Sequence, residues 1–160
     1  MIDGFSRKGE SPRTLEGRVK LAKLDFLLRY PRHLASVLVS RGLRDTAATD
    51  LTRQDSPLES RMLRYRYGPW DPSYYAVLGS LVGRNLIEVV PAEGTHALGY
   101  RTTGKGEELV GQLIADGAFE ELLGRIALLR RHLDLTGETL KKLLYEIPGV
   151  ADATWHEEIR

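Results

Sequence analysis

Residues 71–103, DPSYYAVLGSLVGRNLIEVVPAEGTHALGYRTT, decide the fold expected for this chain. Asp71 followed by Pro72 is typical of a helix start, an N-cap with proline in the first turn. Apolar residues then recur at i, i+3, i+4, i+7 and i+8, which predicts an amphipathic helix. Its inward stripe is expected to be Tyr74, Val77, Leu78, Leu81 and Val82. The β-rich runs on either side of residues 92–95 predict a two-stranded hairpin directly after this helix.

Two helices are expected at the N-terminal side of this stretch. The first runs from Thr14 to about Tyr30 and is apolar on two sides, which is typical of a helix central to its domain. Pro31 ends it. A second, short helix follows and stops at Gly42, a residue type common just after a helix C-terminus.

A third helix is expected immediately before the deciding stretch. Residues 56–59, Ser-Pro-Leu-Glu, read as a capping box with proline at the first helical position. The helix is expected to turn its arginines outward and to end at Gly68. Residues 64–75 hold five of the twelve aromatic residues of the chain. Tyr65 and Trp70 are expected to pack between two helices, whereas Tyr75 lies off the apolar stripe and is expected to be exposed.

Three more helices are expected after the hairpin. Thr103 caps the first, Gly117 separates it from the second, and the third begins near Thr136 and stops at Pro148. Their inward residues are expected to be Leu109, Val110, Leu113 and Ile114, then Phe119, Leu122, Leu123, Ile126 and Leu129, then Leu140, Leu143, Leu144 and Ile147.

This order of elements resembles that of the winged-helix repressors that respond to drugs or to phenolic acids. The resemblance rests on helices, a two-stranded hairpin and a following helix whose start reads YRTTGKGEEL, a "Thr-x-x-Gly" helix start. It implies an α+β fold, mostly α, with a two-stranded wing and additional C-terminal helices. The expected organisation is a flexible leader over 1–13, a winged-helix domain over 14–115, a helical extension over 118–148 and a tail over 149–160.

Composition limits the function classes open to this chain of 160 residues. The absence of cysteine from the sequence excludes disulfides, thiolate catalysis and cysteine-based zinc sites. No apolar run approaches the roughly 18–20 residues that span a bilayer, and the first twelve residues have no signal-peptide core. A cytoplasmic location without membrane association is therefore expected. The net charge is +4 over residues 1–32, +2 over 33–106 and −5 over 107–160. This gradient permits contact with nucleic acid at the front of the chain and disfavours it at the rear, and an ordinary solvated surface is the alternative interpretation.

The sequence contains no recognisable catalytic motif, and we expect no enzyme activity, cofactor or metal. Residues 99–105 fit the phosphate-loop pattern G-x-x-x-x-G-K, but Gly106 stands where a genuine loop has a magnesium-binding Ser or Thr. Adjacent glutamates diverge around a helix and cannot share a proton. The histidines lie far apart without a metal-binding spacing: His33, His96, His132 and His156.

The exposed face of the helix that follows the Asp71-Pro72 start is expected to be small and shallow. Gly79 and Gly83 are four residues apart and share this face, which lets another backbone approach closely. Reading of bases in the major groove requires Arg, Lys, Asn or Gln, which this face lacks apart from Arg84 at its end. The residues predicted to bind a protein partner are Tyr75, Gly79, Gly83 and Trp155.

Nucleic-acid binding remains a second interpretation of the same region. Six basic residues favour a non-specific phosphate-binding patch, although Glu93 occupies the expected wing turn, where a wing that grips phosphate prefers Arg or Lys. The predicted nucleic-acid-binding residues are Arg61, Arg64, Arg66, Arg84, Arg101 and Lys105.

Two stretches, ESRMLRYRYGPWDPSYYAVLGSLVGRNLIEV at 59–89 and TLKKLLYEIP at 139–148, resemble the small middle component of bacterial three-component anti-phage systems of the Lamassu kind. In that family the middle component accompanies an ATPase of the structural-maintenance-of-chromosomes (SMC) type and a separate effector. The resemblance implies a non-enzymatic adaptor that bridges these two partners. The positions that carry it are Arg64, Tyr65, Tyr67, Gly68, Pro69, Trp70, Asp71, Leu140, Lys141, Lys142 and Tyr145.

Two functional hypotheses follow from the sequence. The first is the adaptor subunit of a defence complex, with an SMC-like ATPase and an effector as partners and at most non-specific DNA contact. The alternative is a dimeric winged-helix transcriptional regulator, in which a second copy of the chain is the partner and the six basic residues contact DNA.

Overall fold

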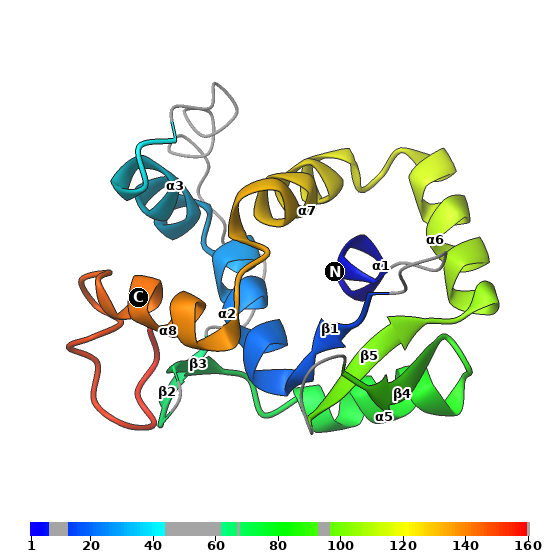
Figure 1. Cartoon of the computed structure of the whole chain (residues 1–160), viewed down its shortest axis with the longest axis horizontal. Coiled ribbons are helices and arrows are strands. Elements are labelled where there is room, and N and C mark those ends of the chain that lie inside the picture. The colour runs from blue at the N-terminus through cyan, green and yellow to red at the C-terminus, as the bar shows by residue number, and fades with distance from the viewer. Residues whose placement is uncertain (7–12, 44–61, 67, 93–96, 160) are drawn as a thin grey trace. The chain divides into compact units, whose positions relative to one another are not determined.

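The computed structural model describes residues 1–6, 13–43, 62–66, 68–92 and 97–159 (Figure 1). The fold is α+β and mostly α, which confirms the expected class. Two compact units divide the chain: unit 1 comprises Met1–Leu21 and Pro72–Asp134, and unit 2 comprises Ala22–Asp71 and Leu135–Arg160. The limits of these units differ from the domain boundaries expected from the sequence. A winged-helix domain over 14–115 stays a prediction.

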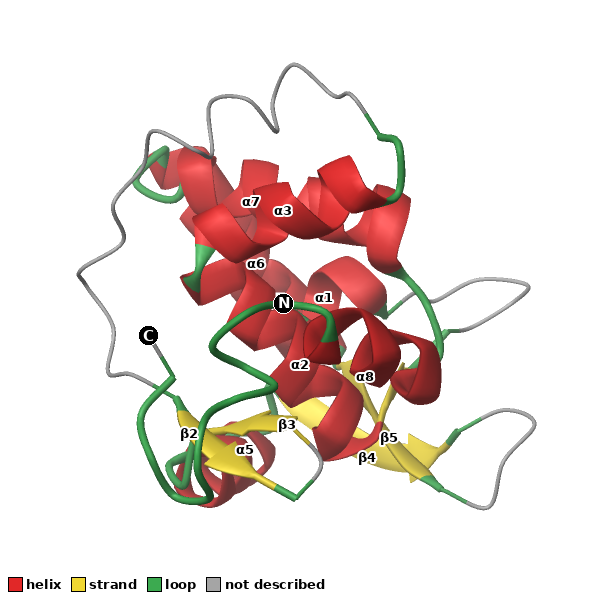
Figure 2. Ribbon diagram, turned by 90° about the vertical axis from the view of Figure 1, so that its left-hand side faces the viewer, coloured by secondary structure: helices red, strands yellow, loops and turns green. Residues whose placement is uncertain are grey.

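Unit 1 contains a three-stranded antiparallel sheet in the order β1-β5-β4 (Figure 1). Figure 2 shows β4 and β5 side by side. The strands are β1 Leu15–Glu16, β4 Ile87–Pro91 and β5 Leu98–Thr102. β4 and β5 form the expected hairpin, whose turn at 93–96 lies outside the described residues. Gly99 lets β1 approach β5, because a Cβ there would lie 2.8 Å from the hydroxyl oxygen of Thr14.

Helix α2 (Gly17–Arg29) replaces the helix expected from Thr14 onward. The residues just after Thr14 form β1 instead, and Gly17 turns the chain into α2 with a φ of 65°, a conformation that glycine adopts without strain. The boundary between the two units falls within α2, after Leu21. Both sides of the later part of α2 are buried, as expected from its two apolar faces; its most buried residues include Leu24, Phe26 and Leu27.

The N-terminal residues differ from the flexible leader that was expected. Ile2–Phe5 form the short helix α1, and Phe5 is buried. Ser6 and Thr102 share a buried hydrogen bond of 3.0 Å between their hydroxyl oxygens. Gly4 brings α1 close to helix α7 (Glu120–Leu133), because a Cβ there would lie 2.6 Å from the Ile126 side chain.

In unit 2, helices α3 (Pro31–Ser40) and α8 (Gly137–Tyr145) occur where they were expected. Gly42 ends the α3 region with a φ of 72°, and the Thr136 side chain caps α8 by accepting a hydrogen bond from the amide of Thr139. The core side chains of these helices include Leu34, Leu38, Leu140 and Leu144, all at 0% exposure.

The prediction of a helix that ends at Gly68 is wrong for the part of this segment that the structure describes. Those residues form an antiparallel hairpin of β2 (Leu63–Tyr65) and β3 (Gly68–Trp70). The expectation rested on a capping box at 56–59, outside the described residues, whereas the run that follows is rich in aromatic residues, which favour strands. The Tyr65 and Trp70 rings lie 6.5 Å apart across the hairpin rather than between helices.

Helix α6 (Gly104–Asp116) begins at Thr103, whose side chain accepts a hydrogen bond from the amide of Gly106 as a helix cap should. The inward direction expected for its apolar stripe is wrong: Leu109, Leu113 and Ile114 are all exposed. In α7, Ile126 and Leu129 are buried as expected, whereas Phe119 just before it is exposed.

Candidate protein-docking surface

Helix α5 (Tyr74–Gly83) packs on β4 in unit 1 through one narrow side. Tyr74 and Leu78, four residues apart, are its buried residues. The expectation that Val77 and Val82 also face inward is wrong, because their side chains are 50% and 41% exposed. The buried side of α5 is narrower than its apolar stripe, so the residues at the edges of the stripe face outward.

We define the α5 outer face as Tyr75, Ala76, Val77, Gly79, Ser80, Val82 and Gly83, all of which are exposed. Tyr75 is exposed by 62%, as expected from its position off the stripe. A Cβ added at Gly79 or Gly83 would meet nothing within 4 Å, so packing inside the chain does not require glycine at either position. The face is shallow and apolar, and it carries no long polar side chain.

One side of the Tyr75 ring lies against a cation from another element. The guanidinium carbon of Arg18, at the start of α2, is 4.8 Å from the centre of this ring. The charge of Arg18 also acts on Tyr100 of β5: burial raises the pKa of the Tyr100 phenol, and this charge opposes the rise. Sequence reasoning missed Arg18, since nothing in the local pattern links it to a helix more than fifty residues later.

The ends of α5 differ from the expected capping. Ser73 rather than Asp71 occupies the N-cap position, and Asp71 forms an ion pair of 2.8 Å with Arg29 in unit 2. Ser73 stands at the N-cap without a side-chain cap hydrogen bond. At the other end, Asn85 adopts a left-handed φ of 56°, which asparagine tolerates, and the chain turns from α5 into β4.

The turn after α5 is stabilised by residues of the 99–106 segment, whose sequence resembles a phosphate loop. The Thr103 hydroxyl donates to the carbonyl of Asn85 at 2.7 Å, and the ammonium of Lys105 donates to the carbonyl of Arg84 at 3.2 Å. Gly106 is buried, and a Cβ there would collide with the Leu86 backbone. The glycine and threonine of this motif therefore have structural roles in packing and capping.

The six residues predicted to contact nucleic acid do not form one patch within either unit. Arg61 lies outside the described residues. Arg64 and Arg66 belong to unit 2, whereas the remaining three, Arg84, Arg101 and Lys105, belong to unit 1. Arg101 is paired with Glu88 at 2.9 Å. Arg84 and Lys105 are exposed, and no ion pair to either is found among the described residues.

The expectation that Arg64 faces outward is wrong, because its side chain is buried. Its guanidinium stacks on the ring of Tyr145 at 4.6 Å and donates to the carbonyl of Tyr65. Its Nε atom is buried without a hydrogen-bond partner. Arg64 therefore contributes to the interior of unit 2 rather than to a phosphate-binding surface.

Trp155 lies in unit 2, in a tail that folds back beside strand β2. The amides of His156 and Ile159 donate to the carbonyls of Arg64 and Met62, and Ile159 is fully buried. Trp155 itself remains 59% exposed. The tail thus has its own packing, and this indole is presented to solvent.

The described residues contain no group of His, Cys, Asp and Glu side chains arranged to hold a metal ion. Among these residues, no helix combines the length and the apolar character that crossing a membrane requires. No family model, curated protein or solved structure matches the chain.

Proposed function

We propose that the chain is a non-enzymatic adaptor, with a winged helix in unit 1, that docks a partner protein through the α5 outer face. In the form that the sequence resemblance suggests, the partner is an SMC-like ATPase of an anti-phage complex and the adaptor links it to an effector. The observation that carries the proposal is the exposure of an apolar helix face at whose two glycines, Gly79 and Gly83, an added Cβ would meet no other atom within 4 Å.

The structure of unit 1 supports this proposal in two ways. α5 leads directly into the β4-β5 hairpin, and a capped helix follows, which is the order expected for a winged helix. The third helix of a winged helix that reads bases carries long polar side chains on its outward side. The α5 outer face instead exposes Tyr75 and Val82 along one edge and Val77 along the other, and exposed apolar patches are typical of protein interaction sites.

Co-purification tests the proposal. The proposal expects a neighbouring gene to encode an SMC-like ATPase; the chain is expressed together with this ATPase, and we expect a stable complex on size-exclusion chromatography. Gly79→Trp and Gly83→Trp should each abolish the complex, because a bulky side chain holds the partner backbone away from the face. Both variants should fold, since neither added Cβ meets another atom within 4 Å.

Gly124→Trp provides the matched control. Gly124 is also an exposed helical glycine of unit 1 with nothing within 4 Å of an added Cβ, but it lies on α7. The control should bind like the unaltered chain. Complexes that survive both α5 substitutions would contradict the docking face, and a neighbouring gene that encodes no ATPase would contradict the Lamassu-like assignment.

The alternative function, a DNA-binding transcriptional regulator, is favoured by one observation: two exposed cations lie close together, Arg84 at the end of α5 and Lys105 of α6, whose ammonium donates to the Arg84 carbonyl. Fluorescence anisotropy with the chain's own promoter DNA separates the two functions. A regulator binds this DNA with base-pair preference and loses binding on Arg84→Glu. An adaptor binds weakly, with steep salt dependence and no preference.

A further inference from the structure

The C-terminal tail of unit 2 presents a tryptophan that the chain does not pack. Trp155 is 59% exposed, and within the part of the chain that the structure describes its indole makes no hydrogen bond and no ring contact. Exposed tryptophan is among the residue types that most often anchor a protein interface. The surroundings of this indole indicate which kind of partner would cover it.

Two further exposed rings lie beside Trp155. Tyr65 on β2 is 39% exposed, and its ring meets the ring of His156 edge-on, with 4.8 Å between the ring centres. His156 follows Trp155 directly in the sequence and is exposed as well. We call Tyr65, Trp155 and His156 the aromatic tip. Three rings gathered on one turn and the strand beside it differ from the single apolar residues that are normal on a protein surface.

The turn that carries Trp155 is ordered by its own hydrogen bonds. The amide of Glu157 donates to the carbonyl of Thr154 at 3.1 Å, and the amide of Thr154 donates to the Glu157 carboxylate at 3.2 Å. The amide of His156 donates to the carbonyl of Arg64 at 2.8 Å, which joins the turn to β2. A partner therefore binds the aromatic tip without first having to order this turn.

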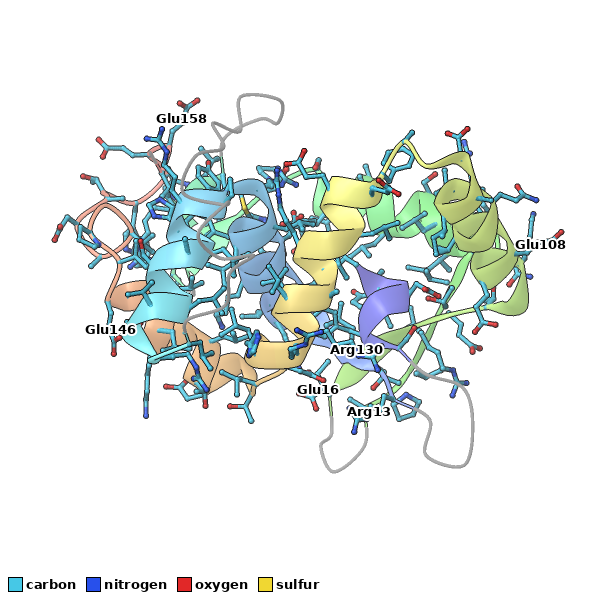
Figure 3. All side chains as sticks on the ribbon, turned by 90° about the horizontal axis from the view of Figure 1, so that it is seen from above. Arg13, Glu16, Glu108, Arg130, Glu146 and Glu158 are labelled. Carbon is cyan, nitrogen blue, oxygen red and sulfur yellow. The ribbon has the colours of Figure 1, made fainter. Side chains whose placement is uncertain are left out.

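Negative charge prevails around the aromatic tip. Residues 149–159 contain no lysine or arginine, and three exposed carboxylate residues: Asp152, Glu157 and Glu158. Figure 3 shows the Glu158 side chain pointing away from the ribbon. On the neighbouring strand segment Arg64 is buried and Arg66 is exposed, so the carboxylates outnumber the cations at the surface.

We propose that the aromatic tip binds an arginine-rich segment of another protein. A guanidinium stacks favourably on the face of an indole, and it also pairs with a carboxylate through two parallel hydrogen bonds. The aromatic tip offers both contacts within a few residues of the chain. Nucleic acid also stacks on aromatic rings, but the three carboxylates repel its phosphates.

This inference goes beyond the proposed adaptor function. The aromatic tip belongs to unit 2 and includes no residue of the α5 outer face. It therefore holds or fails independently of docking on α5, and Gly79→Trp should leave it unaffected.

Fluorescence anisotropy with a labelled hexa-arginine peptide tests the proposal on the full chain. We expect saturable binding that weakens as salt is added, because salt screens the exposed carboxylates. Trp155→Ala should raise the dissociation constant by about tenfold through the loss of the stacked cation. Trp155→Phe keeps a ring and should raise it less. Asp152→Asn/Glu158→Gln should raise the dissociation constant and also reduce its dependence on salt.

Two control variants remove the same chemistry from unit 1. Phe119→Ala deletes another exposed ring, and Glu108→Gln neutralises an exposed carboxylate of α6. Both variants should bind hexa-arginine with the affinity of the unaltered chain. Circular dichroism verifies that Trp155→Ala keeps the fold, as expected for a side chain that is mostly exposed.

Nuclear magnetic resonance of the unaltered chain locates the bound peptide. The chain has two tryptophans, so its proton–nitrogen spectrum contains two indole signals. Trp155→Phe removes one of them and thereby assigns it. Hexa-arginine should shift the Trp155 signal in proportion to the fraction bound.

Three outcomes would overturn the proposal. Hexa-arginine that fails to bind saturably would show that the aromatic tip has no affinity for such a segment. An affinity that Trp155→Ala leaves unchanged would place the peptide elsewhere on the chain. Tighter binding of a six-nucleotide thymidine strand than of hexa-arginine would identify the aromatic tip as a nucleic-acid surface instead.

Discussion

At the scale of single residues, the sequence motif most suggestive of chemistry is explained by packing. Gly106 completes a phosphate-loop-like pattern, but its role is to let α6 pass the Leu86 backbone, with which any Cβ would collide. Gly111 in the same helix has open space around it. Sequence alone could not separate these two glycines, because their difference lies in a contact with a residue twenty positions earlier in the chain.

Substitution of the two glycines by alanine should therefore have opposite effects on stability. Gly106→Ala forces the backbone of unit 1 to shift and should lower the free energy of unfolding by about 2 kcal/mol. Gly111→Ala should raise the free energy of unfolding by up to about 1 kcal/mol, because alanine favours helix more than glycine does. Chemical denaturation measures both values. Equal effects of the two substitutions would contradict the close approach at Gly106.

The buried residue Lys23 leads to a prediction about how the stability of the chain depends on pH. Lys23 lies in unit 2, and the residue is only 2% exposed. Its ammonium donates a hydrogen bond to the carbonyl of Gly137 at 2.8 Å. Burial lowers its pKa from 10.5; the charge of Glu138 opposes this shift and that of Lys141 adds to it. The folded chain thus releases this proton at a lower pH than the unfolded chain does.

Between the lowered pKa and 10.5 the unfolded state holds more protons, so stability attributable to Lys23 rises with pH in that window. The free energy of unfolding of the unaltered chain should increase relative to that of Lys23→Met as the pH approaches 10.5. Denaturation of both proteins at a series of pH values from neutral upward measures the difference. Two parallel pH profiles would show that Lys23 titrates normally.

At the scale of elements, local sequence signals located helices better than they identified buried faces. The capped helices at Thr103 and Thr136 and the hairpin β4-β5 were predictable, because caps and alternating apolar runs act within a few residues. The inward sides of α5 and α6 were predicted too broadly. Periodicity shows which residues share a side of a helix, but the width of the side that is covered depends on what packs there.

The narrow buried side of α5 can be measured directly. Leu78→Ala should lower the free energy of unfolding by about 2–5 kcal/mol, since it empties a buried site. Val77→Ser and Val82→Ser, at exposed positions of the same helix, should each change it by no more than about 0.5 kcal/mol. Thermal or chemical denaturation distinguishes these cases. Large losses at both valines would show that the stripe is buried after all.

At the scale of the whole molecule, the sequence did not reveal the division into two units. Each unit is built from two separate segments of the chain, and α2 belongs to both. The basic residues that looked like one patch are distributed between the units, and Arg64 is buried within unit 2 by stacking on Tyr145. Such long-range arrangements have no signature in local composition, which is why the sequence suggested one basic patch that neither unit contains as a whole.

Calorimetric titration of the purified chain with the SMC-like ATPase that the proposal expects from a neighbouring gene tests the adaptor role most directly. The account predicts that Gly79→Trp weakens binding by at least about a hundredfold, the effect of filling the centre of a packed interface. Gly124→Trp should bind with the affinity of the unaltered chain. Unchanged affinity of the Gly79 variant would show that the ATPase does not dock on α5, and the central claim would be wrong.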